Sequence, residues 1–281
     1  MATVLCVGLT TVDVTQQVAE FPLAGQKVQS LGVHSAPGGP AANAARAVAA
    51  LGHRAVLLTA LGDELGGFAR GLLAGVEVHD LGPGGPALSM VVVRERDGER
   101  TVVSRNAPAF EPRTTVDDGL VAESDVVLVD GHLGPAALAA ARSARRRGVP
   151  VVLDAGSWKP VLDDLLPLVD VAACSASFAL PGRGALPSGL HARGVPLVIR
   201  TNGAAPVTWS HDGVTGEEPV SPVDDVRDTN GAGDVWHGAL AVAVARGLPV
   251  AQAVRWANAV AAVRVRHTAW DWVEELVRWR G

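Results

Sequence analysis

Short apolar segments that alternate with helical segments constrain the fold of this 281-residue chain more than any other feature. Hydrophobic residues make up 48% of the chain, which is enough for a sizeable core. Apolar strands separated by amphipathic helices predict an α/β fold with a doubly wound, mostly parallel sheet and helices on both faces. The predicted strands lie at 3–9, 55–60, 125–130, 149–154, 169–174 and 195–200, and the clearest helix at 135–147. We find no second domain boundary, so we expect one domain over 1–281.

Two stretches interrupt this alternation and predict additional strands. The expected strands lie at 14–18 and 28–33, on either side of a turn, and at 88–94 and 101–105, which form a hairpin. The apolar alternation along 101–105 fits a sheet with one covered face.

The composition argues against several function classes. The net charge is −5 and the only basic block, Arg145 to Arg147, ends a predicted helix, so we expect no nucleic-acid partner and no membrane. No apolar run reaches 18 residues and no basic segment precedes the first strand, so we expect neither a membrane span nor a signal peptide. Cys6 and Cys174 lie in strand-like runs, typical of buried thiols in a reducing cytoplasm.

The segment 228–234, DTNGAGD, precedes a run typical of a buried helix. Gly231 and Gly233 allow the backbone to turn tightly and to approach a ligand closely. The N–H groups at this helix start would form an anion hole, and Asp234 beside it is placed to accept a proton from a nucleophile. The alternative is an N-capping aspartate on a glycine-containing turn.

A second glycine-rich segment lies far upstream at 38–45, GGPAANAA. Gly38 and Gly39 allow close backbone approach, and Asn43 in the first helical turn offers donors and an acceptor to hydroxyl groups. Asp13 follows the first strand, at the sheet edge where ligands gather in doubly wound folds. Local capping by Asn43 and a surface position for Asp13 are the alternatives.

Together, 228–234, 38–45 and 61–66 (LGDELG) resemble the signatures of the ribokinase-like, PfkB-type carbohydrate kinases, and the resemblance covers nearly the whole chain. It implies transfer of the γ-phosphoryl group of ATP to a sugar hydroxyl, with Mg²⁺ bridging the phosphates. Asp234 would act as the base, and the N–H groups of Gly231, Ala232 and Gly233 as the anion hole. Residues 14–35 and 88–106 would form a small β-sheet lid that closes over the sugar.

The same resemblance assigns binding roles to further residues. The sugar would contact Asp13, Gly38, Gly39 and Asn43, and from the lid Arg105 and Asn106. Thr201, Gly203 and Asn258 would line the nucleotide site, although Asn258 would equally suit helix packing. Asp228 matches part of a site for a monovalent cation such as K⁺, and relatives often form homodimers through the lid.

The chain departs from the family pattern at a metal-ordering motif. Where relatives often carry Asn-x-x-Glu, this sequence has Ser175 to Phe178, similar to ketohexokinase-like members, so Asp154 becomes the candidate metal ligand. The segment 38–43 lacks the Gly-Lys-Gly of phosphosugar-acting relatives, which favours an unphosphorylated ketose. A nucleoside kinase is the first alternative, although four Phe and no Tyr leave few residues for an aromatic clamp. A degenerate kinase fold that binds sugar or nucleotide as a regulator is the second.

Overall fold

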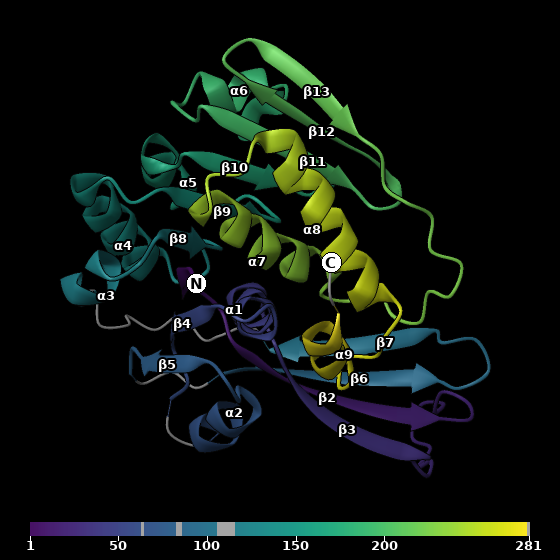
Figure 1. Ribbon diagram of the computed structural model, residues 1–281. Helices are drawn as coiled ribbons and strands as arrows, with labels where there is room; N and C mark the ends of the chain where they lie inside the picture. The colour runs from purple at the N-terminus through teal and green to yellow at the C-terminus, as the bar shows by residue number, and fades with distance from the viewer. Residues whose placement is uncertain (63–64, 83–85, 106–115, 280–281) are drawn as a thin grey trace.

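A nine-stranded sheet forms the centre of the protein (Figure 1). The computed structural model describes residues 1–62, 65–82, 86–105 and 116–279. The sheet order is β13-β12-β11-β10-β9-β8-β1-β4-β5, parallel from β5 to β11, with β12 and β13 antiparallel. The strands are β1 (Thr3–Val7), β4 (Arg54–Thr59), β5 (Glu77–Asp80), β8 (Val126–Val129), β9 (Val151–Ala155), β10 (Val171–Cys174), β11 (Leu197–Asn202), β12 (Ala205–His211) and β13 (Val214–Glu218). The mostly parallel sheet predicted from the sequence is confirmed.

Helices cover both faces of this sheet, as predicted. Along β1, Val4 and Cys6 face one helical layer while Leu5 and Val7 face the other, which is why the strand is apolar from Val4 onward. The first layer contains α1 (Pro40–Ala50), α7 (Ala232–Ala245), α8 (Val250–Val265) and α9 (Trp272–Arg278). The second contains α3 (Asp118–Ala122), α4 (Gly134–Arg147), α5 (Leu162–Leu165) and α6 (Ser188–His191). The short helix α2 (Gly66–Leu72) lies near β3 of the second sheet.

Helices α1 and α7 approach each other closely because small residues line their contact. Ala41, Ala44 and Ala45 of α1 are fully buried. A Cβ atom on Gly238 of α7 would lie only 2.5 Å from the Ala44 carbonyl oxygen. This crossing places the first turn of α1 against the first turn of α7, where the two sequence motifs lie.

A second, four-stranded sheet has the order β3-β2-β6-β7. Its strands are β2 (Thr11–Val18), β3 (Gly32–Gly38), β6 (Ala87–Arg94) and β7 (Arg100–Arg105). The strand predicted at 28–33 was misplaced: β3 pairs with β2 from Gly32 to Gly38. The prediction followed the apolar residues Leu31 and Val33, which are 55% and 59% exposed and contribute nothing to a core.

The predicted covered face of 101–105 was also wrong. Every residue of β7 is exposed, and Val103 is 70% exposed. Because β7 is an edge strand paired with β6 alone, its apolar alternation does not mark a buried face.

The C-terminal tryptophans connect the first helical layer to the second sheet. Trp272 is buried in the core beneath α1 and α8, and Trp279 packs against the same cluster. Trp270 stacks on His34 of β3, with 3.8 Å between ring centroids. Figure 1 accordingly shows α9 beside the small sheet.

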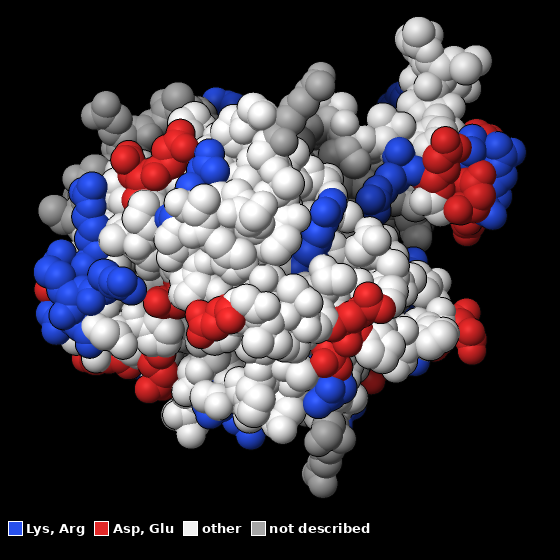
Figure 2. All heavy atoms as spheres, turned by 90° about the horizontal axis from the view of Figure 1, so that it is seen from above, with Lys and Arg blue, Asp and Glu red and all other residues white. Residues whose placement is uncertain are grey.

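Charged side chains are grouped locally on the surface. On the face drawn in Figure 2, patches of Lys and Arg lie beside patches of Asp and Glu around a broad uncharged area. Arg147 forms an ion pair with Asp118, and Arg94 forms one with Asp97. Within the described residues, no helix has the length and apolar character needed to cross a bilayer.

Candidate active site

The two motifs meet through a hydrogen bond between Asn43 and Asp234. Gly231, in a left-handed conformation at φ 72°, begins α7, and Asp234 lies in its first turn. Asn43 lies in the first turn of α1, and its Nδ2 donates to Asp234 Oδ2 at 2.8 Å. Residues 191 positions apart in the sequence therefore form one site.

Arg46 fixes the orientation of the Asn43 side chain. Its Nη1 donates to Asn43 Oδ1 at 3.3 Å and to the Pro37 carbonyl at 3.2 Å. Because Oδ1 accepts from a guanidinium, Nδ2 is the atom that faces Asp234. Sequence reasoning missed Arg46, although its position three residues after Asn43 puts both on one helix face.

The predicted anion hole is only partly open. The N–H of Ala232 donates to the Thr229 carbonyl at 3.3 Å. The N–H groups of Gly231, Gly233 and Asp234 find no acceptor among the described residues. A Cβ atom on Gly233 would meet no atom within 4 Å, so this side of the turn is open, and unpaired N–H groups at a helix start suit an anion.

Electrostatic repulsion and burial make Asp234 more basic than a free aspartate. Burial, and after it the charge of Asp154, raise the pKa of Asp234, and the Asn43 hydrogen bond opposes both, with a net pKa of about 6. A carboxyl group with such a pKa is ionised at neutral pH and still accepts a proton readily.

Asp154, the candidate metal ligand, lies at the end of β9 and is directed toward His237. Burial, and after it the charge of Asp130, raise the pKa of Asp154, with a net value of about 7. Asp154 Oδ2 lies 3.2 Å from His237 Nδ1, while His237 Nε2 lies 3.3 Å from the Ala173 carbonyl oxygen. The buried Nδ1 makes no hydrogen bond within the described residues, and burial lowers the pKa of His237, which favours the neutral imidazole. Asp154 therefore remains the candidate metal ligand, with the His237 ring beside it.

His237 was not identified from the sequence. Its position, three residues after Asp234, places it on the same side of α7, and that spacing could have indicated it. Lys159 was also missed; its charge acts on Asp154 and opposes the increase in the pKa of that carboxyl group.

Gly38 and Gly39 allow the chain to pass close to Asp13. Thr11 Oγ1 donates to Asp13 Oδ1 at 2.8 Å. A Cβ on Gly38 would lie 2.2 Å from Asp13 Oδ2, and a Cβ on Gly39 would lie 2.3 Å from the Leu9 carbonyl oxygen. Burial raises the pKa of Asp13, opposed by hydrogen bonds from Thr11 and Ser89 and by the charge of Arg46.

Thr201 and Gly203, predicted to bind the nucleotide, and the residues predicted to bind the sugar from the lid, lie at strand ends or outside the described residues. Thr201 Oγ1 donates to the Cys174 carbonyl at 3.3 Å, and Gly203 lies at the exposed turn between β11 and β12. Arg105 is exposed at the end of β7. Asn106 lies outside the described residues.

Asn258 and Asp228 already have partners within the chain. Asn258 Oδ1 accepts from Trp236 Nε1 at 2.8 Å and its Nδ2 donates to the Pro219 carbonyl at 3.2 Å, which is the helix-packing alternative. Asp228 Oδ2 lies 2.8 Å from Arg264 Nη2, in an ion pair.

The segment that replaces Asn-x-x-Glu carries no charge. Ser175 Oγ donates to the Gly156 carbonyl at 3.0 Å, and Phe178 is buried in the core beside Trp158. The described residues contain no group of three metal-binding side chains. The segment from Ser175 to Phe178 therefore offers no carboxylate to a metal ion.

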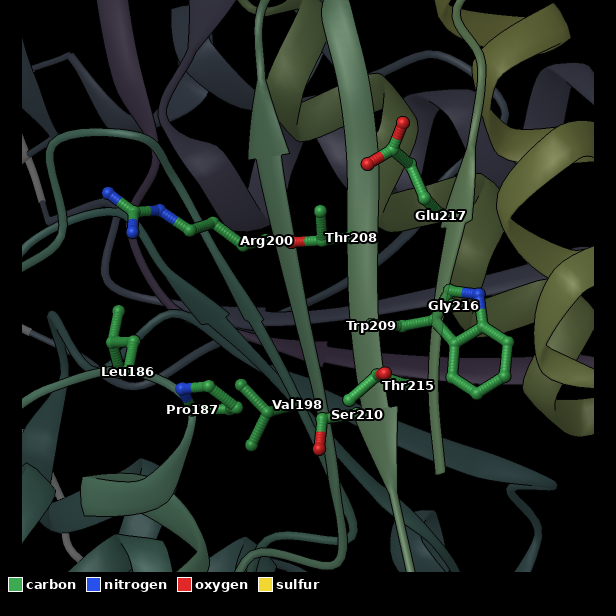
Figure 3. A pocket seen from close by; sticks show the side chains of 10 residues that line it. All are labelled: Leu186, Pro187, Val198, Arg200, Thr208, Trp209, Ser210, Thr215, Gly216 and Glu217. Atoms are coloured by element: carbon green, nitrogen blue, oxygen red, sulfur yellow. The ribbon is translucent and has the colours of Figure 1, made fainter. Parts of the chain in front are cut away.

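A hollow of about 400 Å³ lies elsewhere, across β11, β12 and β13. Figure 3 shows Leu186, Pro187 and Val198 on one side of these strands and Trp209 on the other. Asp234 is not among its lining residues. Arg200 closes one end, where its Nη2 donates to the Ala176 carbonyl at 3.1 Å.

Comparison with known proteins identifies the class. The model of the pfkB family carbohydrate kinases matches residues 1–270. The chain therefore belongs to this family, and it is a carbohydrate kinase.

Individual relatives agree with this assignment. A ribokinase of Arabidopsis thaliana is 26% identical, over 92% of this chain and 75% of the relative. The bifunctional protein HldE of Caulobacter sp. is 31% identical over 85% of this chain, which spans 54% of that longer protein. The structure of Arabidopsis ribokinase complexed with ribose and ATP has a TM-score of 0.82 at 22% identity, covering 99% of both chains, and so shares the fold.

Proposed function

We propose that this kinase transfers the γ-phosphoryl group of ATP to a hydroxyl group of a small, unphosphorylated sugar, most favourably a ketose. The observation that carries the proposal is the 2.8 Å hydrogen bond from Asn43 to Asp234 beside unpaired N–H groups. This arrangement combines a base, an orienting amide and an anion-binding helix start within one site.

In the proposed reaction, Asp234 accepts the proton of the sugar hydroxyl as the oxygen attacks the γ-phosphorus. Asn43 holds the carboxylate in place through Oδ2. The free N–H groups at Gly231 and Gly233 donate to phosphoryl oxygens as charge develops, with Ala232 contributing once its weak bond to Thr229 opens. Mg²⁺ bound with ATP would supply charge neutralisation between the phosphates.

The sugar would lie between Asp13 and Asn43, against the backbone of Gly38 and Gly39. Carboxylate and amide groups suit hydroxyl recognition. The pKa of Arg46, a nearby cation, is lowered to about 10 by burial and by the charge of Arg264, and its guanidinium is bonded to the protein itself. An acidic site with its arginine so occupied favours a neutral sugar over a phosphosugar. Arg105 and Asn106 would complete the site from the lid.

ATP would bind beside the strand-end loop that contains Thr201 and Gly203. The positive φ of Gly203 makes a tight turn with an open surface above it, since a Cβ there would meet no atom within 4 Å. Asn258 would shape this region indirectly, through its bonds to Trp236 and Pro219.

The proposal is tested by phosphoryl transfer from Mg-ATP to free ketoses, aldoses, phosphosugars and nucleosides. We expect the highest kcat/KM with a free ketose. Turnover of nucleosides alone would favour the nucleoside kinase instead. Binding of ATP and a sugar without turnover of any acceptor would favour a regulator. Phe178, in place of the metal-ordering Glu of relatives, would then explain the lack of turnover.

We also propose that two copies associate through the second sheet. Val33, Val102 and Val103 expose apolar surface on its strands. Val33 lies on the edge strand β3 and the other two valines on the opposite edge strand β7, and exposed apolar residues on edge strands favour a protein partner. The buried free thiols of Cys6 and Cys174 suit a reducing compartment, so a cytoplasmic location remains our proposal.

A further inference from the structure

A buried arginine pairs with Asp228, the residue that the sequence resemblance assigned to a monovalent cation site. Arg264, in the last turn of α8, has a side chain only 3% exposed. Its Nη1 donates to the Asp228 carbonyl at 3.1 Å and to the His267 carbonyl at 2.7 Å, and its Nη2 lies 2.8 Å from Asp228 Oδ2. Two carbonyl oxygens and a carboxylate oxygen therefore surround one fixed positive charge.

This guanidinium holds the segment that leads into the anion hole. Asp228 Oδ1 accepts the N–H of Asn230 at 2.9 Å, one residue before Gly231 begins α7. The N–H groups of Arg227 and Asp228 donate to the Val265 carbonyl at 2.8 and 3.2 Å. The turn that presents Gly231 and Gly233 is thus docked on the end of α8 through Asp228.

The surroundings already contain a second positive charge. The Arg46 guanidinium lies 4.7 Å from the ring centroid of Trp272, and that of Arg264 lies 6.0 Å from the same ring. Arg46 in turn orients Asn43. Trp272 therefore connects two cations, one that positions the base and one that positions the anion hole.

The oxygen atoms at Asp228 and His267 do not fit a monovalent ion. A K⁺ ion that bound these oxygen atoms would have to displace the Arg264 guanidinium or lie in contact with it. Two positive charges in contact repel strongly where water is excluded. We propose that Arg264 is a resident cation that orders the 228–231 turn, so that this kinase does not depend on K⁺. The predicted effect of Arg264 on turnover rests on the proposed function, whereas its predicted effect on stability does not.

The test compares wild type, Arg264→Ala and Arg264→Lys in buffers of K⁺ and of tetramethylammonium, a cation too large for the site. Two quantities are measured: Tm, which needs no substrate, and kcat with KM. For wild type we expect equal Tm values and turnover that differs by less than about twofold between the two cations.

For Arg264→Ala we expect kcat to fall by about 10- to 100-fold with a smaller change in the sugar KM, because the anion hole is mispositioned. K⁺ should now raise Tm and restore part of kcat. Arg264→Lys should keep more activity than Arg264→Ala. Arg255→Ala, which removes a half-exposed arginine of the same helix paired with Glu218, should show neither effect.

Three results would overturn the inference: a wild-type Tm that rises specifically in K⁺, wild-type turnover that requires K⁺, or a folded Arg264→Ala with unchanged Tm and kcat. If Arg264→Ala does not fold, Arg264→Lys and the wild-type cation comparison still decide. A chain without kinase activity would fail the turnover assay in every buffer but would leave the Tm comparison intact, so the two failures are distinguishable.

Discussion

At the scale of single residues, the surroundings of Asp234 act on its pKa in opposite directions. Burial and the charge of Asp154 raise it, the Asn43 hydrogen bond lowers it, and the net pKa is about 6. The balance leaves Asp234 ionised at neutral pH but more basic than a free aspartate, as a catalytic base requires.

The pH dependence of activity should reflect this balance. Because the base must be ionised, kcat/KM should rise with pH through about 6. Asn43→Ala removes the hydrogen bond that stabilises the charged carboxylate, so the rising limb should move upward by about one pH unit. Gln252→Ala, at an exposed amide on α8, is the control. A limb that does not move in Asn43→Ala would contradict the assigned role of Asn43.

The same pKa predicts a stability effect. The folded-state pKa of Asp234 lies above its ordinary value of 3.8, so this group stabilises the fold at low pH and the contribution is lost as pH rises through about 6. Asp234→Asn should therefore be more stable than wild type at pH 8 by about 1–2 kcal/mol, less than the full pKa difference implies because the side chain is partly exposed. The advantage should disappear near pH 4 in urea unfolding, and an equal advantage at both pH values would rule out burial of the charge as its source.

At the scale of elements, the site depends on the close crossing of α1 and α7. A Cβ on Gly238 would lie 2.5 Å from the backbone of Ala44, so Gly238→Ala must separate the two helices. We expect a loss of about 1–3 kcal/mol in unfolding free energy. A lower kcat should accompany it, because Asn43 then moves away from Asp234.

Gly71→Ala on α2 is the matched control for this change. A Cβ on Gly71 meets no atom within 4 Å, so alanine there should leave stability unchanged or raise it by up to about 1 kcal/mol. Equal effects of the two substitutions would show that the helix crossing is not responsible.

The elements that the sequence predicted well are those with one dominant signal. The strands β4, β8, β9, β10 and β11 are mostly apolar because both faces of the sheet are covered, and the predicted segments overlap them closely. The strand β3 was misplaced because its buried end, Ala36 to Gly38, lacks large apolar residues, while its pairing with β2 sets its position. Periodicity carries no information about such pairing.

At the scale of the whole molecule, the second sheet carries exposed apolar side chains. Val33, Val102 and Val103 on its edge strands predict a dimer in solution through this sheet. Val103→Arg should therefore convert the dimer to a monomer, which sedimentation velocity would detect. Val214→Arg is the control, since Val214 is 59% exposed on β13 at the far edge of the large sheet. A monomeric wild type would refute the predicted association.

The sequence predicted the residues of the site better than their partners. Asp234, Asn43, Asp13 and the glycine pairs lie in motifs, and the structure brings Asn43 and Asp234 into contact. The contacts of Arg46, His237 and Arg264 depend on tertiary packing, which sequence spacing does not specify. Asp228 and Asn258 were interpreted as ligand residues because nothing in the sequence reveals that Arg264 and Trp236 bind their side chains.

The central claim is that Asp234 is the catalytic base of a sugar kinase, and Asp234→Asn tests it most directly. The measurement pairs steady-state phosphoryl transfer to the best acceptor with calorimetry of ATP binding. We predict a fall in kcat of about 10²- to 10⁴-fold with ATP affinity nearly unchanged. A variant that retains wild-type kcat while binding ATP normally would contradict this account.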